Sequence, residues 1–259
     1  MENKMVDSHI HLDQYQDDEI KFILNHELSV EALITVSTDL SSCKRNLSLS
    51  NIYPKVHTAF GYHPEQPLPS DEELSSLMNW MSQHSNHMVA VGEVGLPYYL
   101  RLKEGTNSFP LEPYISILKE FIKFAKVWDK PIILHAVYDD APLVCDLLEQ
   151  YSIQKAHFHW FKGDQMTVER MIKNGYYISY TPDLIYEKEI QQLALAYPLE
   201  QIFIETDGPW PFEGPFHGKR TNPLMMKLSI QKLAELKNKS EEIIYSQILT
   251  QTKKFYMIK

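Results

Sequence analysis

Two histidines stand two positions apart near the start of the chain, in the run Asp7-Ser8-His9-Ile10-His11. Alternate residues of a β-strand project from the same face, so the His9 and His11 imidazoles are expected to point the same way. Two neutral imidazoles that converge on one point form a natural chelate for Zn²⁺ or a similar ion. The pair alone leaves two interpretations open, a metal site or two ordinary surface or core histidines.

Four further apolar runs also end in ionisable residues, which are Glu93, His135, His157 with His159, and Glu205 with Asp207. A buried carboxylate is costly unless it is paired or bound to metal. Hydrogen bonds could satisfy any one of these groups, but five strands that finish this way at one end favour a shared metal centre. The predicted ligands are His9, His11, Glu93, His135, His159 and Asp207.

The elements that must position these residues are short apolar runs that alternate with longer amphipathic segments. Among the predicted helices are Leu111–Trp128 and Asp140–Tyr151, the first with apolar residues at helical spacing. The eight predicted strands are Met5–His11, Ala32–Ser37, Val56–Gly61, Val89–Gly95, Pro131–His135, Lys155–His159, Tyr177–Tyr180 and Ile202–Glu205.

Strand–helix alternation is typical of α/β proteins with a parallel sheet. Eight units in 259 residues favour a single-domain TIM-type (β/α)₈ barrel over residues 1–259, rather than an open doubly wound sheet. Such barrels carry their active sites at the carboxyl ends of the strands, where the candidate ligands lie. The segments Tyr98–Pro113 and Trp210–Pro223 are predicted to be long loops on that face, and helices near Pro223–Leu236 and Ser240–Tyr256 are expected to close the chain.

The composition narrows the class of protein. The net charge of −9 gives no general attraction to nucleic-acid backbones, although bound metals can supply positive charge locally. The cysteines Cys43 and Cys145 form no CxxC pair, which fits a reducing cytosol. There is no apolar stretch of membrane-spanning length. We therefore expect a cytoplasmic protein with no membrane association and no obligate protein partner.

Five motifs, taken in order, resemble those of the TatD-type hydrolases of the amidohydrolase superfamily: His9-Ile10-His11, Gly92-Glu93-Val94-Gly95-Leu96, Pro131-Ile132-Ile133-Leu134-His135, His159-Trp160-Phe161-Lys162-Gly163 and Glu205-Thr206-Asp207-Gly208-Pro209. The resemblance implies a TIM barrel with two divalent metal ions, and many members of that family are described as deoxyribonucleases. By resemblance, one metal would be held by His9, His11, Glu93 and Asp207, and the second by Glu93, His135 and His159.

That division suits hydrolytic chemistry, because a carboxylate such as Glu93 can bridge two cations about 4 Å apart. Asp207 is the best candidate for the general base that takes a proton from the attacking water. Glu93 and Asp207 are therefore the predicted catalytic residues. The identity of the metals, Mg²⁺, Mn²⁺ or Zn²⁺, stays open.

Three residues are predicted to bind substrate. His63 lies in Gly61-Tyr62-His63-Pro64, which matches a G-x-H-P motif of the family, and either contacts substrate or supports a ligand. Arg220 and Lys162 could bind phosphate, Arg220 through its planar fork. The alternatives are a loop histidine that caps a helix and a surface arginine that pairs with an acid.

Two departures from the family pattern bear on the substrate. Pro97 stands where the family usually has Asp, and Trp160 and Lys162 follow His159 where it more often has Cys and Ser. We expect cleavage of phosphoesters, DNA or a small phosphoester being the substrate, because five basic residues fall in or beside the predicted face loops: Arg101, Lys103, Lys162, Lys219 and Arg220. The alternatives are a small-molecule amidohydrolase, lactonase or phosphoesterase on the same metals, and a metal-binding protein without catalytic activity.

Overall fold

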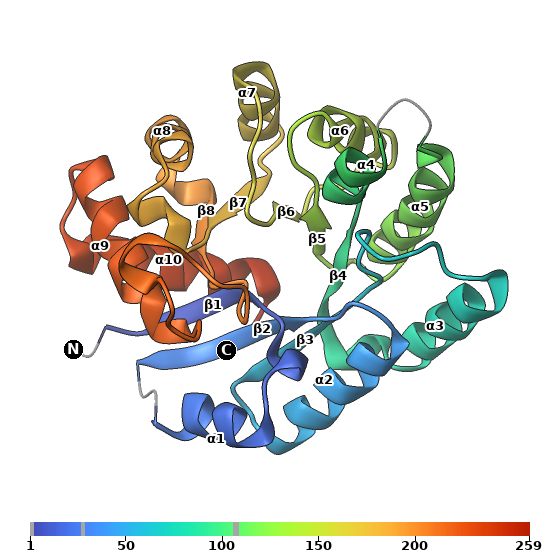
Figure 1. The fold of residues 1–259 in the computed structure, drawn as a ribbon, viewed down its shortest axis with the longest axis horizontal. Coiled ribbons are helices and arrows are strands. Elements are labelled where there is room, and N and C mark those ends of the chain that lie inside the picture. Colours follow the sequence, from blue (N-terminus) through green and yellow to red (C-terminus); the bar gives the residue numbers. More distant parts are fainter. Residues whose placement is uncertain (1–2, 27–28, 106–108) are drawn as a thin grey trace.

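Eight parallel strands form the centre of the molecule in the computed structural model, which describes residues 3–26, 29–105 and 109–259 (Figure 1). Their order in space follows their order in the chain, so each neighbour pair encloses a crossover connection. All eight predicted strands are confirmed, each to within a residue or two at its ends. They are β1 Met5–Ile10, β2 Val30–Val36, β3 Val56–Phe60, β4 Met88–Gly95, β5 Ile132–His135, β6 Ala156–Phe158, β7 Tyr177–Tyr180 and β8 Ile202–Ile204.

The first and last strands meet at their carboxyl ends, which nearly closes the barrel. The Asp207 N–H donates to the His9 carbonyl at 2.9 Å, and the His11 N–H donates to the Gly208 carbonyl at 2.8 Å. The buried Asp7 carboxylate also accepts the Thr206 N–H at 3.0 Å. The protein is therefore a single-domain TIM-type barrel, as the sequence predicted.

Helices surround the strands on the outside of the barrel (Figure 1). None of the helices among residues 3–26, 29–105 and 109–259 is long and apolar enough to cross a membrane. They are α1 Asp17–His26, α2 Leu40–Ile52, α3 Asp71–Gln83, α4 Tyr98–Glu104, α5 Leu111–Val127, α6 Asp140–Gln150, α7 Gln165–Lys173, α8 Lys188–Ala196, α9 Met226–Lys237 and α10 Glu241–Tyr256.

The interior of the barrel changes character along its length. Ile133 and Phe203 belong to a buried apolar cluster inside the barrel. Two residues further on, on the same face of each strand, stand His135 and Glu205, which are also buried. The amino end of the barrel is thus packed with apolar side chains, and its carboxyl end is lined with ionisable ones.

The loop predicted over Tyr98–Pro113 was partly wrong, because α4 occupies its first half. The Glu65 carboxylate accepts the N–H groups of Tyr99 and Leu100 at 2.9 and 2.6 Å, and so satisfies the start of α4 from a distant loop. Residues 106–108 of the segment lie outside the described residues. The Trp210–Pro223 segment is confirmed as a loop with one short 3₁₀ turn, Gly214–Phe216.

Gly95 at the end of β4 allows β4 and β5 to approach each other closely. A Cβ added at Gly95 would lie 1.9 Å from the His135 carbonyl oxygen, so Gly95→Ala must push the two strands apart. We expect a loss in the free energy of unfolding of about 2 kcal/mol or more, measured by urea denaturation. Gly105→Ala is the control, since Gly105 has a positive φ of 98° but nothing within 4 Å of its added Cβ. Equal losses in the two variants would contradict this account.

Candidate metal centre

The Glu93 carboxylate lies at the middle of a group of histidines at the open end of the barrel. Its Oε1 atom is 2.6 Å from His159 Nε2, 3.0 Å from His135 Nδ1 and 3.3 Å from His63 Nε2. Glu93 is fully buried near the carboxyl end of the apolar strand β4. One oxygen of this carboxylate therefore faces three imidazoles that come from β5, the end of β6 and the loop after β3.

The other Glu93 oxygen faces a separate set of ligands. Oε2 is 3.2 Å from His9 Nε2 and 3.4 Å from His11 Nε2. Asp207 Oδ1 lies 3.3 Å from the Nε2 atoms of both histidines. Asp207 has a left-handed backbone, with φ of 48°, which a non-glycine residue adopts only at a cost. The two oxygens of Glu93 thus stand between two sets of donors, as a bridging carboxylate would.

Several of these atoms are buried without a hydrogen-bond partner among the described residues. They include His9 Nε2, Glu93 Oε2 and Asp207 Oδ1, although His9 Nε2 lies only 3.2 to 3.3 Å from the two oxygens. Such orphaned polar atoms are rare and costly. Donor atoms of His9, His11 and Glu93 lie within 4.8 Å of one another, and imidazole nitrogens with carboxylate oxygens are the donors that zinc and manganese accept. The residues present therefore fit a divalent-metal site.

His159 and His157 have different surroundings in the structure. His157 Nδ1 lies 2.6 Å from the Tyr256 hydroxyl and Nε2 lies 2.7 Å from Ser179 Oγ, so both ring nitrogens are engaged inside the barrel. His159 instead faces Glu93, and its Nδ1 lies 3.6 Å from Glu205 Oε1. This geometry supports the predicted ligand role of His159, with Glu205 behind its ring.

The charges of the centre shift several pKa values. Burial opposes ionisation of Glu93, but the surrounding imidazoles, His159 foremost, outweigh it and hold the pKa of Glu93 well below its usual range. Burial also opposes ionisation of Asp207, yet the adjacent His11 and His9 lower its pKa. Conversely, Glu93 and Asp207 raise the pKa of His9 to about 9 against the effect of burial. His9 therefore keeps its second ring proton at neutral pH while the centre is free of metal.

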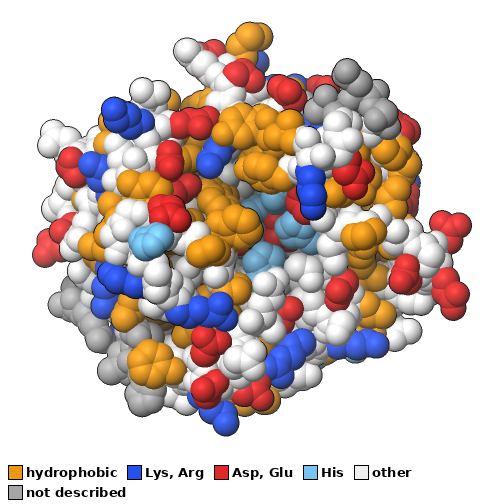
Figure 2. Space-filling model, in the orientation of Figure 1, with side chains coloured by type: hydrophobic (Ala, Val, Ile, Leu, Met, Phe, Trp, Pro, Cys, Tyr) orange, Lys and Arg blue, Asp and Glu red, His pale blue; other side chains and the backbone are white. Residues whose placement is uncertain are grey.

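A pocket of about 900 Å³ opens above the centre. Figure 2 shows histidines at the floor of this hollow, with hydrophobic side chains around much of its rim. Its wall includes two of the three predicted substrate-binding residues, His63 and Lys162. The remaining lining residues are His11, Gln14, Thr38, Glu65, Gln66, Glu93, Tyr99, His135, His159, Trp160, Asp207, Pro209 and Trp210.

Arg220, the third predicted substrate-binding residue, lies elsewhere. Its guanidinium pairs with Glu19 at 2.9 Å, stacks over the Tyr15 ring at 4.9 Å and lines a separate pocket with those residues. Arg101 is likewise held, by Asp140 at 2.5 Å. Of the five basic residues expected around the mouth, Lys162 is the one that lines the metal pocket, so the expected basic rim is only partly formed.

Glu65 is a residue of the pocket wall that sequence reasoning missed. Its carboxylate lines the pocket and lies 3.2 Å from His135 Nε2. The signal was present, because Glu65 follows His63 and Pro64 in a loop on the same face as the ligands.

A TIM-type barrel with this buried cluster of histidines and carboxylates at the carboxyl ends of its strands defines a metal-dependent hydrolase. The model of the TatD related DNase family matches residues 6–257, and the chain belongs to that family. It is 41% identical, over 98% of its own length and all of the other chain, to an uncharacterized metal-dependent hydrolase of Haemophilus influenzae. The crystal structure of YjjV, a TatD homologue of Escherichia coli, has a TM-score of 0.86 with 25% identity over the whole of both chains. A TatD-family hydrolase of Entamoeba histolytica, 18% identical with a TM-score of 0.84 over the whole of both chains, shows the same fold.

Metal binding should release protons, because His9 must lose its proton before Nε2 can bind a cation. The raised pKa of His9 means that this proton stays on until about pH 9. We expect the apparent affinity for Mn²⁺ to rise with pH between neutrality and about pH 9. Calorimetric titration in buffers of different ionisation enthalpy gives the number of protons released. An affinity that is constant over this window, without proton release, would contradict the assignment.

His159→Ala and His157→Ala should affect different properties, metal binding in the first case and stability in the second. Loss of His159 should lower the metal content, measured by elemental analysis after dialysis. Loss of His157 removes the partner of the buried Tyr256 hydroxyl and leaves Ser179 Oγ with the Trp160 N–H, so we expect the free energy of unfolding to fall by about 2 kcal/mol. Metal loss confined to the His157 variant would reverse the assignment.

Proposed function

We propose that this metal-dependent hydrolase uses two divalent ions to cleave phosphoester bonds, with the end of a DNA strand or a small nucleotide as substrate. The observation that carries the proposal is the position of Glu93, whose two oxygens each face their own set of imidazoles. Two cations held by one carboxylate suit an in-line displacement at phosphorus, because the attacking and leaving oxygens both need positive charge beside them.

The residues would divide as their distances suggest. His9, His11 and Asp207 with Glu93 Oε2 would hold one ion, and His135 and His159 with Glu93 Oε1 the other. When bound, the ions would supply charge for phosphoryl oxygens and lower the pKa of water.

Asp207 would accept the proton of the attacking water. Its carboxylate reaches the pocket while the strand end behind it is fixed by the hydrogen bond to His9. Asp207 would be ionised at neutral pH, which is the state in which a carboxylate can accept a proton, and its lowered pKa makes it a weak base.

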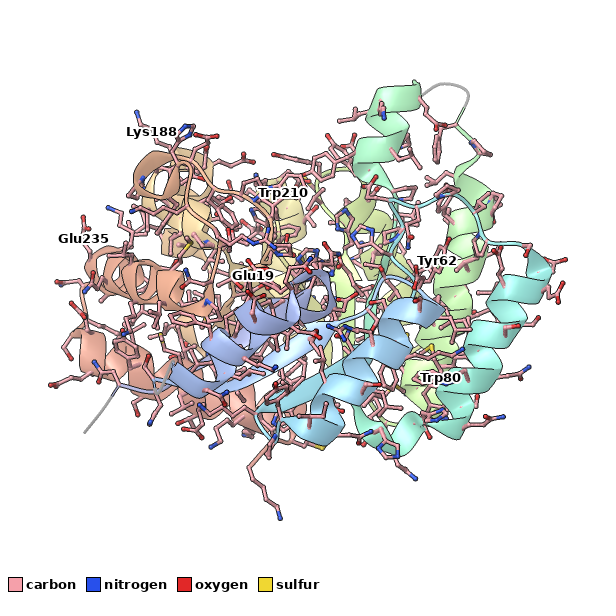
Figure 3. All side chains as sticks on the ribbon, turned by 60° about the horizontal axis from the view of Figure 1, so that its bottom comes forward. Glu19, Tyr62, Trp80, Lys188, Trp210 and Glu235 are labelled. Carbon is pink, nitrogen blue, oxygen red and sulfur yellow. The ribbon has the colours of Figure 1, made fainter. Side chains whose placement is uncertain are left out.

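The pocket wall supports a substrate that carries a flat ring. Trp210, labelled in Figure 3, is 56% exposed. Its ring lies edge-on to that of Trp160, with the ring centres 5.9 Å apart. Tyr99, 47% exposed, also lines the pocket. Exposed aromatic faces beside a phosphoester site can stack a nucleobase without reading its sequence. Lys162, whose Nζ lies 5.3 Å from the Trp160 ring centre, adds a positive charge on this wall.

A second candidate is hydrolysis of a small amide or lactone on the same metals. The pairing of Arg101 and Arg220 with carboxylates favours it, because these cations are then poorly available to a long phosphate backbone. This alternative needs the same ligands and differs in the pocket wall alone.

The deciding experiment offers metal-loaded protein single-stranded DNA and mononucleotide phosphodiesters beside lactones and amides, with Mg²⁺ or Mn²⁺. We expect phosphoester cleavage. Trp210→Ala should raise KM for base-bearing substrates about tenfold through lost stacking, and leave KM for a phosphodiester without a ring unchanged. Lys162→Ala should raise KM for both, with a smaller effect on kcat. Turnover of lactones or amides without phosphoester cleavage would replace this proposal by the second candidate.

A further inference from the structure

Glu65 contacts two histidines of the centre in two different ways. Its backbone N–H donates to His63 Nδ1 at 3.1 Å. Its carboxylate Oε1 lies 3.2 Å from His135 Nε2. One residue in the loop after β3 is therefore bonded to both imidazoles, on the side of each ring that faces away from Glu93.

The contact with His63 determines where that ring carries its proton. A backbone N–H can only donate, so His63 Nδ1 must accept and cannot itself be protonated while the bond exists. The single proton of the neutral ring is then on Nε2. That atom faces Glu93 Oε1 at 3.3 Å, and His63 lines the pocket.

The contact with His135 has the opposite effect. An ionised carboxylate can only accept, so His135 Nε2 must carry the proton that Glu65 receives. The lone pair of the neutral ring is then on Nδ1, which lies 3.0 Å from Glu93 Oε1 and 3.2 Å from His159 Nε2. This is the arrangement in which a carboxylate behind a histidine fixes its free nitrogen toward a metal.

We propose that Glu65 holds His135 and His63 in place for different tasks, so that His135 binds metal through Nδ1 while His63 presents an Nε2–H to an oxygen of the substrate. Glu65 is thus a positioning residue that assigns two similar rings to two tasks. The proposal rests on the metal centre and not on the identity of the substrate.

The distances alone would allow His63 another role. Donor atoms of His63, Glu93 and His135 all lie within 4.8 Å of one another, which is close enough for a shared cation. To bind that cation through Nε2, however, His63 would have to give up its last ring proton while Nδ1 still accepts from Glu65. The neutral ring cannot do both, so the Glu65 N–H excludes His63 from the ligand set for as long as this bond is kept.

The Glu65 carboxylate is itself fixed by the start of α4. Oε1 accepts the Tyr99 N–H at 2.9 Å, and Oε2 accepts the Leu100 N–H at 2.6 Å. These two bonds hold the Glu65 carboxylate at the pocket wall, although Glu65 lies in a different loop from α4.

The test compares two variants that differ in one N–H group. Glu65→Ala removes the carboxylate and keeps the backbone donor, whereas Glu65→Pro removes both. Glu104→Gln, an exposed acid at the end of α4, is the control. Protein with ¹⁵N-labelled histidine is loaded with Zn²⁺, and ring nitrogen shifts report the tautomer of each histidine. Zn²⁺ affinity is measured by competition with a chelating dye, and folding by thermal unfolding.

In the unaltered protein we expect His135 to be protonated on Nε2 and bound through Nδ1, and His63 to be protonated on Nε2. Glu65→Ala should release the His135 tautomer alone and weaken Zn²⁺ binding about 10- to 100-fold. Glu65→Pro should release the tautomer of His63 as well. Glu104→Gln should change neither.

Three results would overturn the proposal. They are a His63 ring bound to Zn²⁺ or protonated on Nδ1 in the unaltered protein, a His135 tautomer that is unchanged in a folded Glu65→Ala variant, and unchanged Zn²⁺ affinity in that variant. Should Glu65→Pro not fold, the spectrum of the unaltered protein still decides the state of His63. None of these measurements uses a substrate, so their outcome does not depend on whether the protein cleaves phosphoesters.

Discussion

The buried Glu93 carboxylate determines which side chains can surround it at the carboxyl ends of the strands. No solvent reaches this side chain, so its charge has to be balanced by neighbours. The balance comes from imidazoles on β1, β5 and the end of β6, and from the loop after β3. Those segments are far apart in the chain, and the parallel order of the strands brings their carboxyl ends to one level. The amino end of the barrel is filled by apolar side chains, and this packed interior supports the imidazole rings from below.

Much of this arrangement could be predicted from the sequence, because its causes are local. Each strand is an apolar run, and inward-facing positions recur at every second residue, so the pattern of residues alone places His135 and His159 at strand ends. The contacts that sequence reasoning missed depend on residues distant in the chain. Arg220 was expected at the phosphate site, but its partner is Glu19 on the first helix. The start of α4 looked like a loop because the group that satisfies it, Glu65, precedes β4.

The metal-ligand candidates and the pocket wall lie on different parts of the fold. Metal-ligand candidates lie on or directly after strands, where a change of one residue would turn a side chain to the other face. The pocket wall is built largely from loops and from the start of α4, and it includes Tyr99, Trp160 and Trp210. Such segments tolerate exchange without disturbing the barrel. The loops of the pocket wall can therefore differ between family members while the metal-ligand candidates stay in place. Membership of the family says little about the pocket wall.

The seam between β1 and β8 has a consequence for how the enzyme becomes active during synthesis. Glu93, His135 and His159 all come from the middle of the chain, whereas His9 and His11 at its start share their set with Asp207, which follows the last strand. The backbone bonds that bring Asp207 to His9 form only when β8 docks beside β1. A chain emerging from the ribosome carries one set of ligands well before the other can exist. The cluster of His9, His11 and Asp207 is completed in the same step that closes the barrel, so an unfinished chain cannot assemble it.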